Sequence, residues 1–130
     1  MDTELRFPRL IADNAGGSRF DFVTIAVSPQ HFAPPAKPFS VSALEQASQC
    51  GFLHLPTGWV GEPHPSPIRM WIFVLQGQMQ FEASDGETRL ISPGSGLLLE
   101  DTWGRGHSSR VISDGPATLA AVRLPENSAA

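Results

Sequence analysis

Alternating apolar and polar residues mark out short β-strands along most of the chain. The clearest case is residues 78–83, where Met79, Phe81 and Ala83 share one face and the polar residues share the other. Further segments rich in β-branched, aromatic or alternating residues predict strands at residues 5–11, 20–27, 39–41, 51–55, 68–75, 88–91, 97–99, 107–112 and 118–123. Short strands at this spacing are typical of an all-β barrel or sandwich.

Glycine and proline separate these segments. The chain holds 12 of each, spread so that nearly every gap carries a turn signal, such as the hairpin signal at Asp85-Gly86. Residues 59–67 include three prolines and are expected to be extended. Residues 42–49 have a helical composition but span only about two turns, so a helix and an extended segment both stay open.

The length of the chain fits a single domain. At 130 residues, one hydrophobic core is enough, and nothing in the pattern suggests a second. We expect an N-terminal arm over residues 1–19, a barrel over residues 20–124 and a short tail over residues 125–130.

Composition and charge narrow the range of possible binding partners and cellular locations. The net charge of −4, without a stripe of lysine and arginine, argues against binding the phosphate backbone of a nucleic acid. The acidic N-terminus lacks the features of a signal peptide, and the longest apolar run, residues 70–75, is too short to span a membrane. The sequence therefore favours a cytoplasmic protein without a membrane partner. Its one cysteine, Cys50, cannot form an internal disulfide and is expected to be buried and inert.

The second half of the chain resembles the cupin barrels. Gly58, His64 and Gly77 stand at the spacing of the first cupin motif, and a Pro93-Gly94 turn precedes His107, which corresponds to the histidine of the second. Residues 100–107 (Glu-Asp-Thr-Trp-Gly-Arg-Gly-His) are similar to a pattern in small single-domain bacterial cupins. Over residues 50–123 the resemblance implies a cupin-type double-stranded β-helix, or jelly-roll barrel, and a homodimer.

The chain departs from the usual cupin metal site, which takes three histidines and a glutamate. His64 and His107 match, but Ser66 stands at the second histidine position and Met70 at the glutamate position. Serine and methionine are poor ligands for most first-row divalent metals. The resemblance therefore leaves two possibilities: no cofactor, or a single divalent transition metal on His64 and His107. A carboxylate could assist it; the nearest in sequence are Glu62, Glu100 and Asp101.

Two functions follow from this pattern. The first is binding of a small molecule in the barrel interior; the second is a metal-dependent enzyme of the dioxygenase, isomerase or decarboxylase type, using His64 and His107. The missing metal ligands favour the first function. The residues expected to line the pocket are His54, His64, Ser66, Met70, Trp103 and His107.

Several of these residues have more than one interpretation. His64 and His107 could act as an acid/base pair, since imidazole exchanges protons near neutral pH. Asp101 could orient His107 or cap the backbone of its loop, and we expect the cap. Gly104 and Gly106 are expected to supply positive φ in that loop. Arg69 should face away from Met70, toward an interface or an ion pair.

Overall fold

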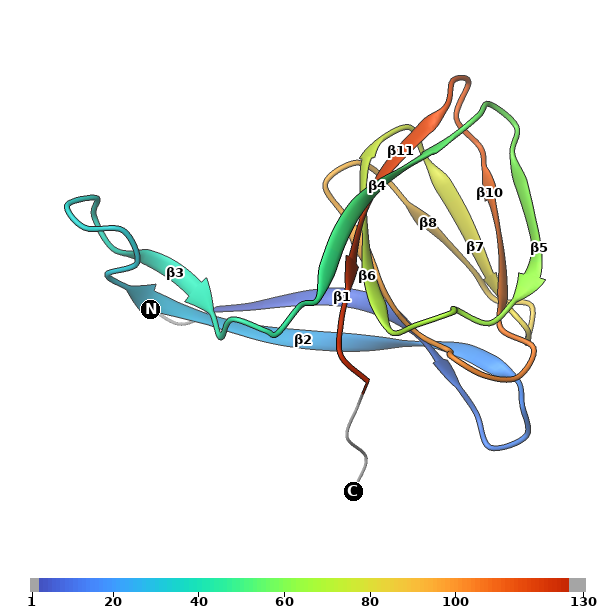
Figure 1. Ribbon diagram of the computed structural model, residues 1–130, viewed down its shortest axis with the longest axis horizontal. Helices are drawn as coiled ribbons and strands as arrows, with labels where there is room; N and C mark the ends of the chain where they lie inside the picture. The colour runs from blue at the N-terminus through green and yellow to red at the C-terminus, as the bar shows by residue number, and fades with distance from the viewer. Residues whose placement is uncertain (1–2, 127–130) are drawn as a thin grey trace.

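Two β-sheets face each other and enclose the interior of the molecule (Figure 1). The structure is a computed structural model that describes residues 3–126. Its strands are β1 (Thr3–Ala12), β2 (Ser18–Gln30), β3 (Phe39–Ser42), β4 (Gln49–Leu55), β5 (Val60–His64), β6 (Met70–Gln76), β7 (Met79–Ala83), β8 (Thr88–Ile91), β9 (Gly96–Glu100), β10 (His107–Val111) and β11 (Ala117–Arg123). The larger sheet has the order β3-β2-β1-β9-β6-β11-β4, and the smaller has the order β5-β10-β7-β8. The prediction of an all-β jelly-roll barrel is confirmed.

The core lies between the sheets because alternate residues of each strand point inward. In β7, Met79, Phe81 and Ala83 are buried, as their alternation with polar residues predicts. Leu97 and Leu99 of β9 meet them from the larger sheet. Burial of such side chains is the main term that stabilises the fold.

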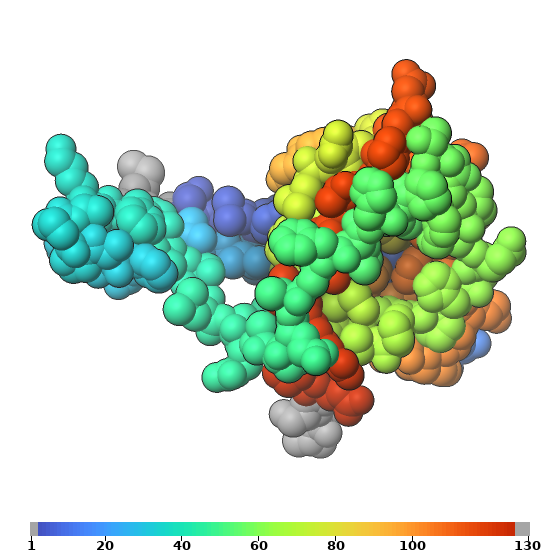
Figure 2. All heavy atoms as spheres, turned by 45° about the horizontal axis from the view of Figure 1, so that its top comes forward, coloured from blue at the N-terminus to red at the C-terminus, as the bar shows by residue number. Residues whose placement is uncertain are grey.

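The first strand belongs to the barrel sheet. All of β1 pairs with β2, and β1 also runs parallel to β9, so Leu10 is fully buried in the core. The predicted boundary between an arm and the barrel at residue 19 therefore falls inside β2. What projects from the barrel is a ribbon made of the outer ends of β1 and β2 together with β3 (Figures 1 and 2). Residues 1–2 of the predicted arm and 127–130 of the predicted tail lie outside the described residues.

The segment between β3 and β4 is not helical, although its composition left a helix and an extended segment both open. It runs without helix from Ser42 to Gln49, and no helix occurs elsewhere in residues 3–126. Since β4 is the last strand of its sheet, it is largely exposed, and Cys50 within it is exposed as well. The prediction of a buried cysteine is therefore wrong.

The outer face of the larger sheet carries a second, smaller apolar cluster. Trp71, Leu98 and Leu124 are buried there, and the Trp71 indole N–H donates to a carboxylate oxygen of Glu45 at 3.3 Å. This contact ties the segment before β4 to the sheet. Within the part of the chain that the structure describes, no helix is long and apolar enough to cross a membrane.

Candidate functional site

His64 and His107 lie side by side in the smaller sheet. They are register partners across β5 and β10, and their ring centroids are 5.1 Å apart. The sheet register is irregular just after this pair, between His107 and Ser109. The structure therefore brings together the two histidines that the motif spacing singled out.

The loop before β10 lets the two strands approach each other. Gly104 and Gly106 have positive φ, as predicted, a backbone conformation that residues with a side chain rarely adopt. A Cβ at Gly106 would also collide with the backbone carbonyl of His64. Glycine is needed at this position both for its backbone conformation and for its contact with the strand that carries His64.

His107 is held by a buried carboxylate. Its Nδ1 lies 2.6 Å from Oδ2 of Asp101, and the two residues are 3% and 0% exposed. Asp101 Oδ1 has no hydrogen-bond partner among the described residues. Asp101 thus orients the His107 ring, and the expectation that its side chain caps the loop backbone is wrong. The backbone carbonyl of Asp101 accepts instead, from the Ser66 N–H at 2.9 Å.

His64 is held by the backbone of its own strand. Its Nδ1 lies 2.7 Å from the carbonyl oxygen of Glu62, and its side chain is exposed. Because both rings are fixed through Nδ1, the Nε2 atom of each is left for other contacts.

A cavity of about 360 Å³ opens beside the two histidines. Its walls are largely apolar and come from both sheets. The apolar residues include Leu53, Leu55, Trp59, Phe81, Leu99 and Leu119. The polar side chains that line it are His64, Ser66, His107 and Ser109, and no lysine, arginine, aspartate or glutamate does.

Two further predicted pocket residues, Ser66 and Met70, line the cavity. The Ser66 hydroxyl is 1% exposed and donates to the carbonyl oxygen of Ile68 at 2.6 Å, so its hydrogen is already used. Arg69, beside Met70, points away from the cavity, as predicted. It forms an ion pair with Glu100, its Nε lying 2.6 Å from Oε2.

The residues around the cavity do not fit a divalent metal. Such a site in proteins usually takes three or more histidine, cysteine or carboxylate ligands, and no group of three that could hold an ion occurs in residues 3–126. The carboxylates that could have assisted are engaged or turned away. Asp101 binds the Nδ1 side of His107, Glu100 is bound by Arg9 and Arg69 outside the cavity, and Glu62 is exposed.

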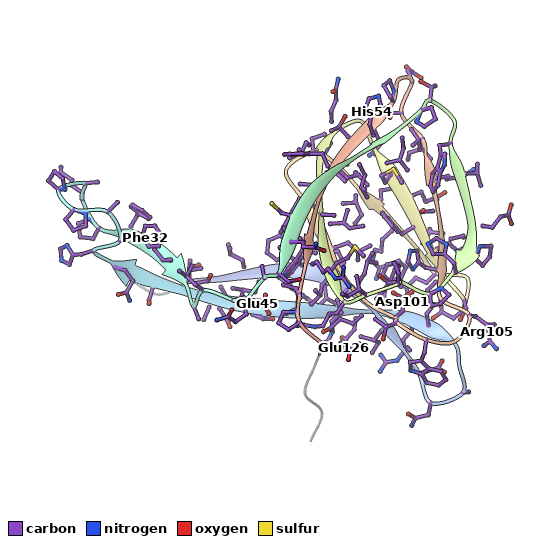
Figure 3. All side chains as sticks on the ribbon, viewed as in Figure 1. Phe32, Glu45, His54, Asp101, Arg105 and Glu126 are labelled. Carbon is purple, nitrogen blue, oxygen red and sulfur yellow. The ribbon has the colours of Figure 1, made fainter. Side chains whose placement is uncertain are left out.

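His54 and Trp103, both predicted as pocket residues, lie outside this cavity. His54 is exposed and its Nδ1 lies 3.1 Å from the Thr118 hydroxyl oxygen, at the end of the barrel away from Asp101 (Figure 3). Leu53 and Leu55 face the cavity, so strand alternation turns His54 outward. Trp103 is 53% exposed and lies against Gly16, in the turn between β1 and β2.

Trp59 is one of several cavity residues that the sequence pattern did not single out, along with Ser109 and most apolar residues of the walls. It lines the cavity and packs against the main core. Its aromatic ring stands just before β5, and only the path of that loop decides that it turns inward. For the part of the wall formed by β4, the available signal was the alternation of Leu53 and Leu55 with His54 along the strand.

Several solved structures resemble the chain. The cupin domain of Cnp3 from Schizosaccharomyces pombe is 15% identical, with a TM-score of 0.49 and coverage of 95% of this chain and 84% of that chain. A Cupin 2 conserved barrel domain protein from Leptotrichia buccalis is 10% identical, with a TM-score of 0.47 and coverage of 96% and 78%.

A third similar structure is an enzyme. The epimerase RmlC from Legionella pneumophila is 13% identical, with a TM-score of 0.48 and coverage of 92% of this chain and 72% of that chain. Two of these three structures are cupin domains by name, and at these identities the likeness concerns the fold alone. No protein-family model matches the chain, and no curated protein matches it.

Proposed function

We propose that this cupin-like barrel binds a small, chiefly apolar molecule in its interior without a metal ion, and that His64 and His107 contact the polar end of that molecule. The observation that carries the proposal is the cavity, whose walls are apolar except where the two histidines and two serines reach it. Small-molecule sites have this composition, with mostly apolar walls and a few convergent polar groups.

The size of the cavity supports a compact ligand. Its volume of about 360 Å³ lies near the lower end of the range for small-molecule sites, about 300–1,000 Å³. Apolar surface that a ligand buries there contributes roughly 25 cal/mol per Å². A molecule of one or two fused rings therefore matches the space and the walls.

The alternative, a metal-dependent enzyme, has less support. Two histidines reach the cavity, but Ser66 offers only a neutral hydroxyl and Met70 only a thioether, which are poor ligands for most first-row divalent metals. An acid/base reaction without metal would use the same two rings on a bound molecule, so binding comes first in either case. The homodimer and the cytoplasmic location stay predictions.

Binding of naphthalene to the full chain, followed by amide shifts in NMR spectra, tests the proposal. We expect saturable one-to-one binding, with shifts at cavity residues such as Phe81 and Leu119. Ala121→Phe should abolish it, because Ala121 lines the cavity and the larger ring would fill the space.

Ala120→Phe is the matched control. Ala120 neighbours Ala121 on β11, and strand alternation turns it to the opposite face. This variant should bind naphthalene as the unaltered chain does. No saturable shift, or unchanged binding by Ala121→Phe, would contradict the proposal.

A further inference from the structure

The hydrogen bond between Asp101 and His107 determines which nitrogen of that ring is free. With Asp101 ionised, its Oδ2 can only accept a hydrogen bond, so the short contact places the proton on His107 Nδ1. In a neutral imidazole the other nitrogen, Nε2, then carries the lone pair. This atom makes no hydrogen bond within residues 3–126 and is not enclosed by protein. Because the His107 ring packs against Phe81, which lines the cavity, we infer that Nε2 faces the cavity.

The same reasoning holds for His64. The partner of its Nδ1 is the carbonyl oxygen of Glu62, which has no proton to give. Nδ1 must therefore be the donor, and Nε2 of neutral His64 is a hydrogen-bond acceptor too. Both rings line the same cavity, with centroids 5.1 Å apart, and each has Nε2 as its available acceptor.

The cavity offers few donors to set against these acceptors, and the indole N–H of Trp59 is one of them. The Ser66 hydroxyl already donates to Ile68, which leaves Ser109 as the one hydroxyl among the lining residues with its hydrogen uncommitted. No cationic side chain lines the walls. At about pH 8, where an ordinary imidazole is neutral, a carboxylate or phosphate would meet two lone pairs without a compensating charge, and burying it would be costly.

We propose that the ligand is a neutral, apolar molecule carrying a hydroxyl or N–H group, and that this group donates to Nε2 of His64 or His107. The proposal rests on the proposed function and adds the chemical class of the ligand. A ligand donor inserted between the two rings satisfies acceptors that the protein leaves open, whereas an ether or ketone of the same shape does not.

Three probes with the same ring system separate this proposal from the proposed function: 2-naphthol, 2-methoxynaphthalene and 2-naphthoate, titrated against the full chain. We expect 2-naphthol to bind roughly three- to tenfold more tightly than 2-methoxynaphthalene, the usual effect of one hydrogen bond. The anion 2-naphthoate should bind more weakly than both. Equal affinities for 2-naphthol and 2-methoxynaphthalene, or a preference for the anion, would overturn the requirement for a hydrogen-bond donor on the ligand. Such a result would still agree with binding in an apolar pocket. Absence of binding by all three would overturn the proposed function itself.

His64→Phe provides the matched variant. It keeps an aromatic ring at an exposed position but removes an acceptor, so the preference for 2-naphthol over 2-methoxynaphthalene should fall at least about twofold if His64 shares the donor. His54→Phe makes the same change at an exposed histidine outside the cavity and should leave the preference unchanged. A preference that survives His64→Phe assigns the donor to His107, which His107→Gln tests next; survival in both folded variants would contradict the proposal.

Discussion

The polar end of the cavity joins two regions that are neighbours in one sheet but are held in different ways. One, the buried wall, consists of Asp101 and His107 on the loop and strand β10. The other, the exposed rim, consists of Glu62 and His64 on β5. In the wall a side-chain carboxylate fixes the imidazole, whereas in the rim a backbone carbonyl does so.

The difference concerns stability rather than the direction in which the rings point. Both arrangements leave Nε2 free, but the wall buries a carboxylate whose only side-chain partner within residues 3–126 is His107. Breaking such a buried pair leaves an uncompensated polar group, which is costly. The rim, open to solvent, has no such penalty.

The largest effect is expected at Gly106, where the backbones of the wall and the rim touch. Gly106→Ala combines a side chain at positive φ with a collision against the His64 carbonyl, so we expect a loss of about 4 kcal/mol or more of unfolding free energy. Urea denaturation measures it. Gly115→Ala, at a glycine with open space and no positive φ, should change stability by less than about 0.5 kcal/mol. Similar values for the two variants would show that the wall and the rim do not depend on this contact.

The next effect separates the two histidines. His107→Ala should lower the unfolding free energy by about 3 kcal/mol, because it leaves Asp101 buried without a partner. His64→Ala should cost less than about 1 kcal/mol, because solvent can replace its single bond. Both values come from chemical denaturation.

A double variant distinguishes a lost pair from lost packing. The double variant Asp101→Ala/His107→Ala should lose at least about 1 kcal/mol less unfolding free energy than the two single variants lose together. Additive losses, or equal costs for His64→Ala and His107→Ala, would contradict the distinction between wall and rim.

The smallest effect is expected from metal ions. Added Zn²⁺, Mn²⁺ or Ni²⁺ should raise the melting temperature by less than about 1 °C, since two histidines without a third ligand bind such ions weakly. Differential scanning calorimetry of chelator-treated protein measures the shift, with His64→Ala as the control. A rise of several degrees that His64→Ala removes would favour the metal-dependent alternative.

Local pattern predicted most of the strands, and the resemblance to cupins placed His64 and His107 together, but neither indicated which of their neighbours face the cavity. Alternation places His54 opposite Leu53 and Leu55, yet it does not say which face is inward. That depends on the packing of β4 against β11. Trp59 and Trp103 both stand in loops, and the loop path alone sends the first into the cavity and the second to the surface.

Long-range contacts explain the remaining differences. The pairing of β1 with β9 joins residues far apart in sequence. Local pattern does not reveal such a contact, so the first strand was predicted to belong to an arm. The edge position of β4, which exposes Cys50, follows from the sheet order and leaves no local signature. The bond between Asp101 and His107 forms because a loop with two positive-φ glycines folds the chain back on itself.

The protonated nitrogen of each ring is the most direct test of the account. Long-range ¹H–¹⁵N correlation spectra of the ¹⁵N-labelled chain at about pH 8, where an ordinary imidazole is neutral, distinguish Nδ1 from Nε2 protonation. Spectra of His31→Gln and His54→Gln leave the signals of His64 and His107 identified. The account predicts the proton on Nδ1 and a bare Nε2 in both rings. A proton on Nε2 of either ring would contradict it, because that ring would then offer the cavity a donor in place of an acceptor.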